Sequence, residues 1–91
     1  MGHTVLRLYI TGKTLHSETA ARRLQALCEK ELAGTFEIEV IDVLERPQLA
    51  EDEKIVATPT LIKQLPPPIR RIIGDLSDTE KVLVGLDLVP K

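Results

Sequence analysis

The sequence predicts an α/β fold in which helices cover both faces of a mixed four-stranded sheet, in the order β-α-β-α-β-β-α. Three observations predict it. Residues 5–10 are almost continuously apolar, which is typical of a strand buried on both faces. Residues 20–32 carry apolar side chains three and four positions apart, which is typical of an amphipathic helix. Residues 60–63 and 69–73 are two further apolar stretches separated by prolines, as in an antiparallel pair. With 91 residues, the chain is expected to form a single domain over residues 1–91.

The first strand and helix are bounded by polar and small residues. Gly12 ends the strand, and either Thr14 or Ser17 can cap the helix, with Glu18 in its first turn. The expected apolar stripe of this helix consists of Ala20, Leu24, Leu27, Cys28 and Leu32. Gly34 is a suitable residue just beyond its end.

The next two predicted elements are a strand, indicated by alternating apolar and acidic residues, and a helix, indicated by a proline at its start. Residues 36–40 alternate apolar and acidic, and apolar residues continue to Val43, which predicts a strand parallel to the first. Pro47 fits the first position of a helix. The pattern over residues 48–57 predicts a weaker helix with Leu49, Glu53 and Val56 on one side.

The last third of the chain predicts a hairpin and a helix. Residues 60–63 form the third strand, prolines 66–68 force a turn, and residues 69–73 form the antiparallel fourth strand. A capping box, Ser77-x-x-Glu80, begins the last helix. Residues 81–89 fit a helical face and a strand face about equally, and Gly85 is poor in a helix interior, so both structures remain open there.

Composition excludes several functions. The only aromatic residues are Tyr9 and Phe36, which leaves no stacking platform for single-stranded nucleic acid, and the net charge of −2 is wrong for tracking phosphates. No apolar run is long enough to span a membrane, and no signal peptide is visible. One cysteine cannot form an intrachain disulfide, which fits a cytoplasmic location. We therefore expect neither nucleic acid nor membrane as partner.

The individual candidates for chemistry are weak. Cys28 lies on an apolar stripe and is interpreted as a core residue. His16 lacks an evident nucleophile or orienting carboxylate and is interpreted as a solvated loop residue, and no spacing suggests a metal site. No cofactor and no catalytic residue are expected.

The Thr58-Pro59-Thr60 strand start, followed by a hairpin, a glycine turn and a helix, resembles the second half of a thioredoxin-like domain. The resemblance implies a cis peptide bond before Pro59. However, the loop at 11–17, where a thioredoxin has its Cys-x-x-Cys motif, contains no cysteine. A redox scaffold without redox chemistry indicates a binding protein.

Nearly the whole chain also resembles the KaiB family of circadian clock proteins. The segments that carry this resemblance are residues 40–44, 46–50, 57–61, 65–68, 70–77 and 82–88. The resemblance implies a non-enzymatic protein that binds the N-terminal ATPase ring of KaiC, sequesters KaiA in cyanobacteria, competes with the SasA sensor domain and engages the CikA kinase. It also implies a metamorphic chain. One state is a β-α-β-β-α-α-β fold that forms homo-oligomers, and the other is the thioredoxin-like monomer that binds KaiC.

The resemblance also implies site residues. The KaiC contact would involve Gln48, Leu49, Asp52 and Lys54. The fold-switch positions would be Pro59, Gly85 and Asp87. The chain departs from the family pattern in two respects. Thr4 and Pro90 stand in place of terminal aromatics, which argues against the tetramer. Glu39 stands in place of a basic residue, which argues against the KaiA contact.

Two other functions remain open. A sensor domain that recruits a histidine kinase would share the fold, and neighbouring genes would identify it. A thioredoxin-like redox enzyme would depend on Cys28, and the missing Cys-x-x-Cys argues against it.

Overall fold

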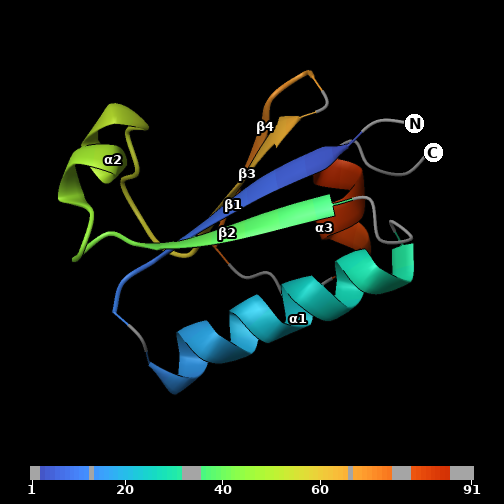
Figure 1. The fold of residues 1–91 in the computed structure, drawn as a ribbon, viewed down its shortest axis with the longest axis horizontal. Coiled ribbons are helices and arrows are strands. Elements are labelled where there is room, and N and C mark those ends of the chain that lie inside the picture. The colour runs from blue at the N-terminus through green and yellow to red at the C-terminus, as the bar shows by residue number, and fades with distance from the viewer. Residues whose placement is uncertain (1–2, 13, 32–35, 66, 75–78, 87–91) are drawn as a thin grey trace.

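A four-stranded sheet with the order β2-β1-β3-β4 forms the centre of the computed structural model (Figure 1). The structure describes residues 3–12, 14–31, 36–65, 67–74 and 79–86. The elements are β1 (Thr4–Ile10), α1 (Leu15–Glu31), β2 (Phe36–Asp42), α2 (Pro47–Asp52), β3 (Thr60–Leu65), β4 (Arg70–Ile73) and α3 (Thr79–Gly85). Their order confirms the predicted thioredoxin-like arrangement.

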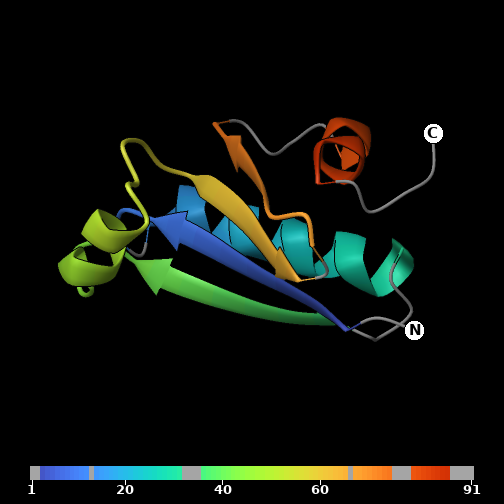
Figure 2. The same cartoon turned by 90° about the horizontal axis from the view of Figure 1, so that it is seen from above.

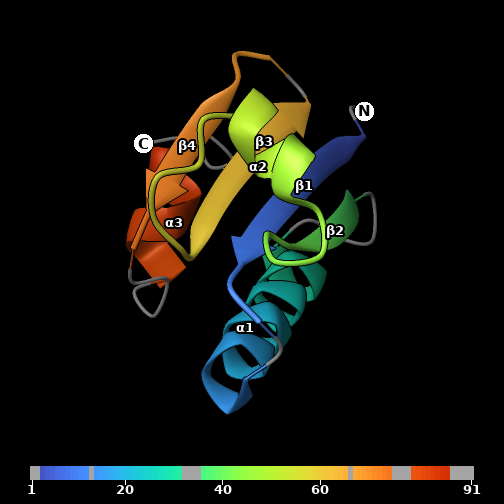
Figure 3. The same ribbon diagram turned by 90° about the vertical axis from the view of Figure 1, so that its left-hand side faces the viewer.

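The sheet is mixed because its central strand β1 has one parallel and one antiparallel neighbour. β1 runs parallel to β2, with Leu8 opposite Val40, and antiparallel to β3, with Leu8 opposite Leu61. β4 pairs antiparallel with β3 and forms one edge, while β2 forms the other. Helices α1 and α3 cover one face of the sheet, and α2 lies on the opposite face (Figures 2 and 3).

The main core lies between the sheet and the α1/α3 layer. Its buried residues are Leu6, Leu8, Ile10, Leu24, Leu27, Cys28, Leu61, Val82 and Leu86. A smaller cluster lies under α2, on the other face of the sheet, and consists of Tyr9, Ile41 and Ile62 with Val43, Leu49 and Ile55 packed against it. Alternation along β1 and β3 explains the division, because successive side chains point to opposite faces.

Thr14 caps α1. Its hydroxyl accepts a hydrogen bond from the Ser17 amide at 3.2 Å, and the Ser17 hydroxyl oxygen accepts one from the Thr14 amide at 2.9 Å. The exchange resembles a capping box with serine in place of glutamate. Of the expected stripe, Leu24, Leu27 and Cys28 are buried, whereas Leu32 lies outside the described residues.

Helix α2 is shorter than its pattern predicted, and the expectation of a helix to Ala57 is wrong. The helix ends at Asp52 because Lys54 adopts a positive φ of 56°. The Lys54 amide donates to the Glu51 carbonyl at 3.1 Å and the Ile55 amide to the Ala50 carbonyl at 2.8 Å, which are the two bonds of a Schellman motif. Val56 therefore lies beyond the helix and is 85% exposed.

The conflict within residues 81–89 is resolved as helix up to Gly85. Val82 and Leu86 are buried in the main core, so packing against the sheet selects the helical periodicity. The capping residue Ser77 and the segment after Leu86 lie outside the described residues. Within the described ranges, none of the helices has the length and apolar character that crossing a bilayer requires.

Candidate functional site

The predicted partner-binding residues Gln48, Asp52 and Lys54 are exposed on and just after α2, and we call this region the α2 surface. Gln48 Nε2 donates to Asp52 Oδ1 at 2.9 Å, a pairing of residues four apart on one side of the helix. None of the residues of α2 is fully buried. The α2 surface therefore presents an ordered amide, a carboxylate and an ammonium group to solvent.

Leu49 lies differently from the other predicted contact residues. It is half-buried and packs with Ile55 against the cluster of Tyr9, Ile41 and Ile62. Its side chain therefore seats α2 on the sheet, and only part of it is available to a partner.

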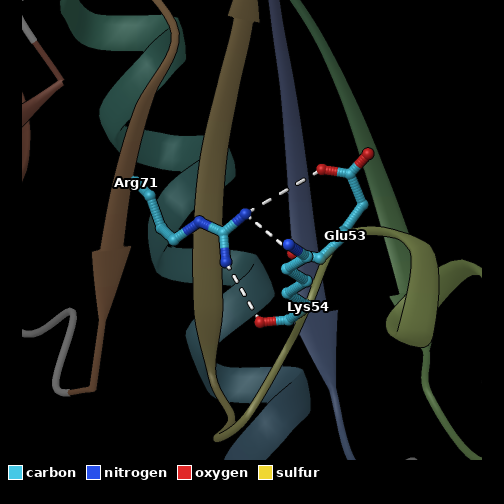
Figure 4. A network of polar contacts seen from close by, with 3 residues as sticks. All are labelled: Glu53, Lys54 and Arg71. Carbon is cyan, nitrogen blue, oxygen red and sulfur yellow. Dashed lines mark hydrogen bonds and ion pairs between the residues drawn. The ribbon is translucent and has the colours of Figure 1, made fainter.

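Arg71 and Glu53 belong to the same region and were missed as site residues. Arg71 reaches from β4 to the turn after α2, where Nη2 donates to the Glu53 carbonyl at 2.8 Å and Nη1 to the Lys54 carbonyl at 3.3 Å (Figure 4). The same Nη2 lies 4.0 Å from Glu53 Oε1. By sequence, the adjacent pairs Arg22-Arg23 and Arg70-Arg71 are either partner-binding patches or solvated surface residues, and the pattern does not indicate which side chain is engaged.

A second charged pair lies on neighbouring strands of the same sheet face. Arg7 Nε lies 3.3 Å from Glu39 Oε1. The pKa of Arg7 is raised, mainly by the nearby Tyr9 hydroxyl. Burial is the next largest effect and lowers this pKa, and the charges of Glu39 and Glu53 raise it further. Among the described residues, the buried Tyr9 hydroxyl has no hydrogen-bond partner.

A small cavity of about 110 Å³ lies where the end of β1 meets the start of α1. Its described lining consists of Ile10, Thr11, Thr14, Ser17, Ala20, Thr58 and Pro59. The Thr11 and Thr58 hydroxyls lie 2.6 Å apart, and the Thr58–Pro59 bond is cis as predicted. These side chains offer hydroxyl groups but no thiol.

Cys28, the only cysteine, lies in the main core and not in this cavity. It is 1% exposed, as its interpretation as a core residue predicted, and burial raises the pKa of its thiol to about 11. At neutral pH the thiol is protonated and a poor nucleophile. In the part of the chain that the structure describes, no group of three His, Cys, Asp or Glu side chains is placed to hold a metal ion.

Of the three expected fold-switch positions, the structure describes Gly85 and Pro59. Gly85 is the last residue of α3, and a Cβ atom there would lie 3.0 Å from Ile72 Cδ1. Pro59 lines the cavity, and Asp87 lies outside the described residues.

Comparison with known proteins adds independent information. The family model described as the KaiB domain matches residues 7–88. The circadian clock protein KaiB3 of Synechocystis sp. is 58% identical over 91 residues, which is 100% of this chain and 89% of that protein. The circadian clock oscillator protein KaiB of Thermosynechococcus vestitus is 60% identical over 85 residues, which is 93% of this chain and 79% of that protein.

Solved structures agree with the fold. The N-terminal domain of Synechococcus elongatus SasA matches with a TM-score of 0.73 and 26% identity, covering 100% of this chain and 90% of that domain. Mitochondrial thioredoxin 3 of Saccharomyces cerevisiae matches with a TM-score of 0.72 and 16% identity, covering 98% of this chain and 81% of that one. The second likeness concerns the fold alone.

Proposed function

The chain belongs to the KaiB family of circadian clock proteins, and on that premise we propose that it is a non-enzymatic binding protein whose α2 surface docks on the N-terminal ring of a KaiC-like ATPase. The observation that carries the proposal is the α2 surface itself. Its polar groups are exposed, with Gln48 bonded to Asp52, and they lie on or just after a helix that buries none of its residues completely. Binding would regulate the phosphorylation cycle of the ATPase in the cytoplasm.

A non-enzymatic role is supported by the cavity near Pro59. The described residues that line it supply only hydroxyl and apolar groups, and the single thiol is buried elsewhere with a raised pKa. Thiol–disulfide exchange requires an accessible thiolate.

Fold switching that controls binding is part of the proposal. Residues 81–89 have a sequence that fits both helix and strand. Among the α3 side chains that the structure describes, only Val82 is buried, and Leu86 is buried just after the helix. Pro59, Gly85 and Asp87 would be the positions that bias the equilibrium, and the alternative fold would form homo-oligomers. KaiA and histidine kinases related to SasA or CikA are further proposed partners.

A second candidate function is a sensor domain that recruits a histidine kinase. The likeness to the SasA N-terminal domain favours it, since the match covers the whole of this chain. The identities of 58% and 60% to KaiB proteins favour the first function over this one.

The test uses two matched pairs of side chains. Gln25 Nε2 donates to Glu29 on α1 at 3.1 Å, and this exposed pair resembles Gln48–Asp52 except that it lies on the opposite layer. The substitutions Gln48→Ala and Asp52→Arg are each made and titrated against purified KaiC of Thermosynechococcus vestitus. We expect Asp52→Arg to weaken binding at least tenfold, about 1.4 kcal/mol, and Gln48→Ala to weaken it by a smaller factor.

The control variants Gln25→Ala and Glu29→Arg should bind like the unmodified chain. Equal weakening by the α1 and α2 variants would show that the α2 surface is not the docking site. Binding of a histidine kinase in place of KaiC would favour the sensor function.

A further inference from the structure

The α2 surface is built on an element that is weak by itself. Helix α2 has six residues, and an isolated helix of that length is not stable in water. It ends in a turn where Lys54 has a φ of 56°, a left-handed conformation that is unfavourable for a residue with a side chain. Something outside the helix must therefore hold the turn.

Besides the two backbone bonds of the Schellman motif, two sets of side-chain contacts hold it. Leu49 and Ile55 pack on the small apolar cluster, but both are only half-buried. Arg71 supplies the polar contacts, because its guanidinium donates to the carbonyls of Glu53 and Lys54 and lies 4.0 Å from the Glu53 carboxylate (Figure 4). A planar guanidinium can serve two carbonyls in fixed geometry, which an ammonium cannot.

The guanidinium of Arg71 lies where a positive charge is favourable. The carbonyls at the end of a helix carry partial negative charge, so a cation there is favourable. The Arg71 side chain is 36% exposed and that of Glu53 is 33% exposed, so both are partly shielded from solvent. The contact joins residues 17 and 18 positions apart, from the turn after α2 to the edge strand β4.

From this geometry we infer that Arg71 is a positioning residue for the α2 surface: it locks the turn at Glu53–Lys54 and thereby fixes where Asp52 and Lys54 are presented to a partner. The inference rests on the proposed function for its effect on binding, but the locked turn can be measured without a partner. Arg70 provides a matched control, because adjacent residues of a strand point to opposite faces.

The first measurement is NMR on the unmodified chain. The Nη protons of Arg71 should be resolved and slow to exchange at low temperature, whereas those of Arg70 should be averaged. Averaged Arg71 resonances would overturn the inference without any substitution.

The second measurement is amide hydrogen exchange in three variants. Arg71→Met keeps the aliphatic stem and removes the donors, so the Ile55 amide, which bonds the Ala50 carbonyl at 2.8 Å, should exchange at least tenfold faster. The exchange rates of the β1 amides should change less than twofold. This distinguishes loss of the Arg71 contacts from general destabilisation of the fold. Arg71→Lys should restore part of the protection, and Arg70→Ala should leave it unchanged.

Titration with Thermosynechococcus vestitus KaiC completes the test. Arg71→Met should weaken binding at least fivefold, Arg71→Lys should weaken it less, and Arg70→Ala should bind normally. If Asp52→Arg weakens binding while Arg71→Met does not, the positioning role is overturned and the proposed function stands. If neither weakens binding, the proposed docking site fails, and with it the role assigned to Arg71.

Discussion

Lys54 occupies a backbone conformation that normally favours glycine. It is the C′ residue of the Schellman motif that ends α2, with a φ of 56°. A side chain at such a position costs about 1–2 kcal/mol, and the surrounding bonds from Arg71, Glu51 and Ala50 maintain it. The sequence pattern did not reveal the end of the helix because lysine is an ordinary helix residue.

Substitution at Lys54 tests this interpretation through stability. Lys54→Gly should raise the free energy of unfolding by about 0.5–1 kcal/mol, because relief of strain exceeds the added entropy of the unfolded chain. Lys54→Val should lower it by about 1–2 kcal/mol, because a β-branched residue is an outlier at positive φ. Urea unfolding measures both. Equal stability of the two variants would contradict the left-handed assignment.

The raised pKa of Cys28 makes the stability of the fold depend on pH. Burial favours the neutral thiol, so the folded pKa of about 11 lies above the ordinary value of 9.0. The stabilising contribution is complete below pH 9 and is lost as pH rises from 9 toward 11. The unmodified chain should therefore lose stability over this interval relative to Cys28→Ala.

Alkylation gives an independent measure of the same burial. Iodoacetamide at pH 8 should label Cys28 slowly in the folded protein and rapidly in urea. Rapid labelling of the folded protein would mean that the thiol is accessible, and the pH-dependent loss of stability should then be absent as well.

At the scale of the elements, the strands were predictable because their apolar periodicity reflects burial directly. The continuous apolar run of β1 matches its central position, and the alternation in residues 36–40 matches the edge position of β2. The end of α2 was not predictable, since it depends on the left-handed Lys54. Nor was the contact between Arg71 and Glu53, because it requires the sheet register and the path of α2 across it.

Gly85 at the end of α3 offers a test of how that element is held against the sheet. An added Cβ would lie 3.0 Å from Ile72 Cδ1, the far end of a flexible side chain that can move by a few tenths of an ångström. Gly85→Ala should therefore stabilise α3 by up to about 1 kcal/mol through helix propensity. Circular dichroism and urea unfolding measure the change.

A double-mutant cycle tests the contact between residue 85 and Ile72. Ile72→Val removes the Cδ1 atom, so Gly85→Ala should be more favourable in that background than in the unmodified chain. Strictly additive effects would mean that Ile72 does not limit the space beside Gly85.

At the scale of the whole molecule, stability should be distributed unevenly. β1 pairs on both sides and has buried residues on both faces. By contrast, β4 is an edge strand, and the buried residues at the described part of α3 are Val82 within the helix and Leu86 just after it. Native-state hydrogen exchange should therefore show that α3 and β4 open with a lower free energy than β1. A single shared opening free energy for all three would contradict this expectation.

The contact between Arg71 and the α2 turn also has a consequence for the order in which the chain is made. Residues 48–54 are synthesised before Arg71, which follows Lys54 by 17 positions. At a synthesis rate of about 5–20 residues per second, the delay is roughly 1 to 3 seconds. During that interval the nascent chain carries the residues of the α2 surface but not the residue that holds them in place. A partner that reads this surface by its shape therefore meets it only after Arg71 has been added to the chain.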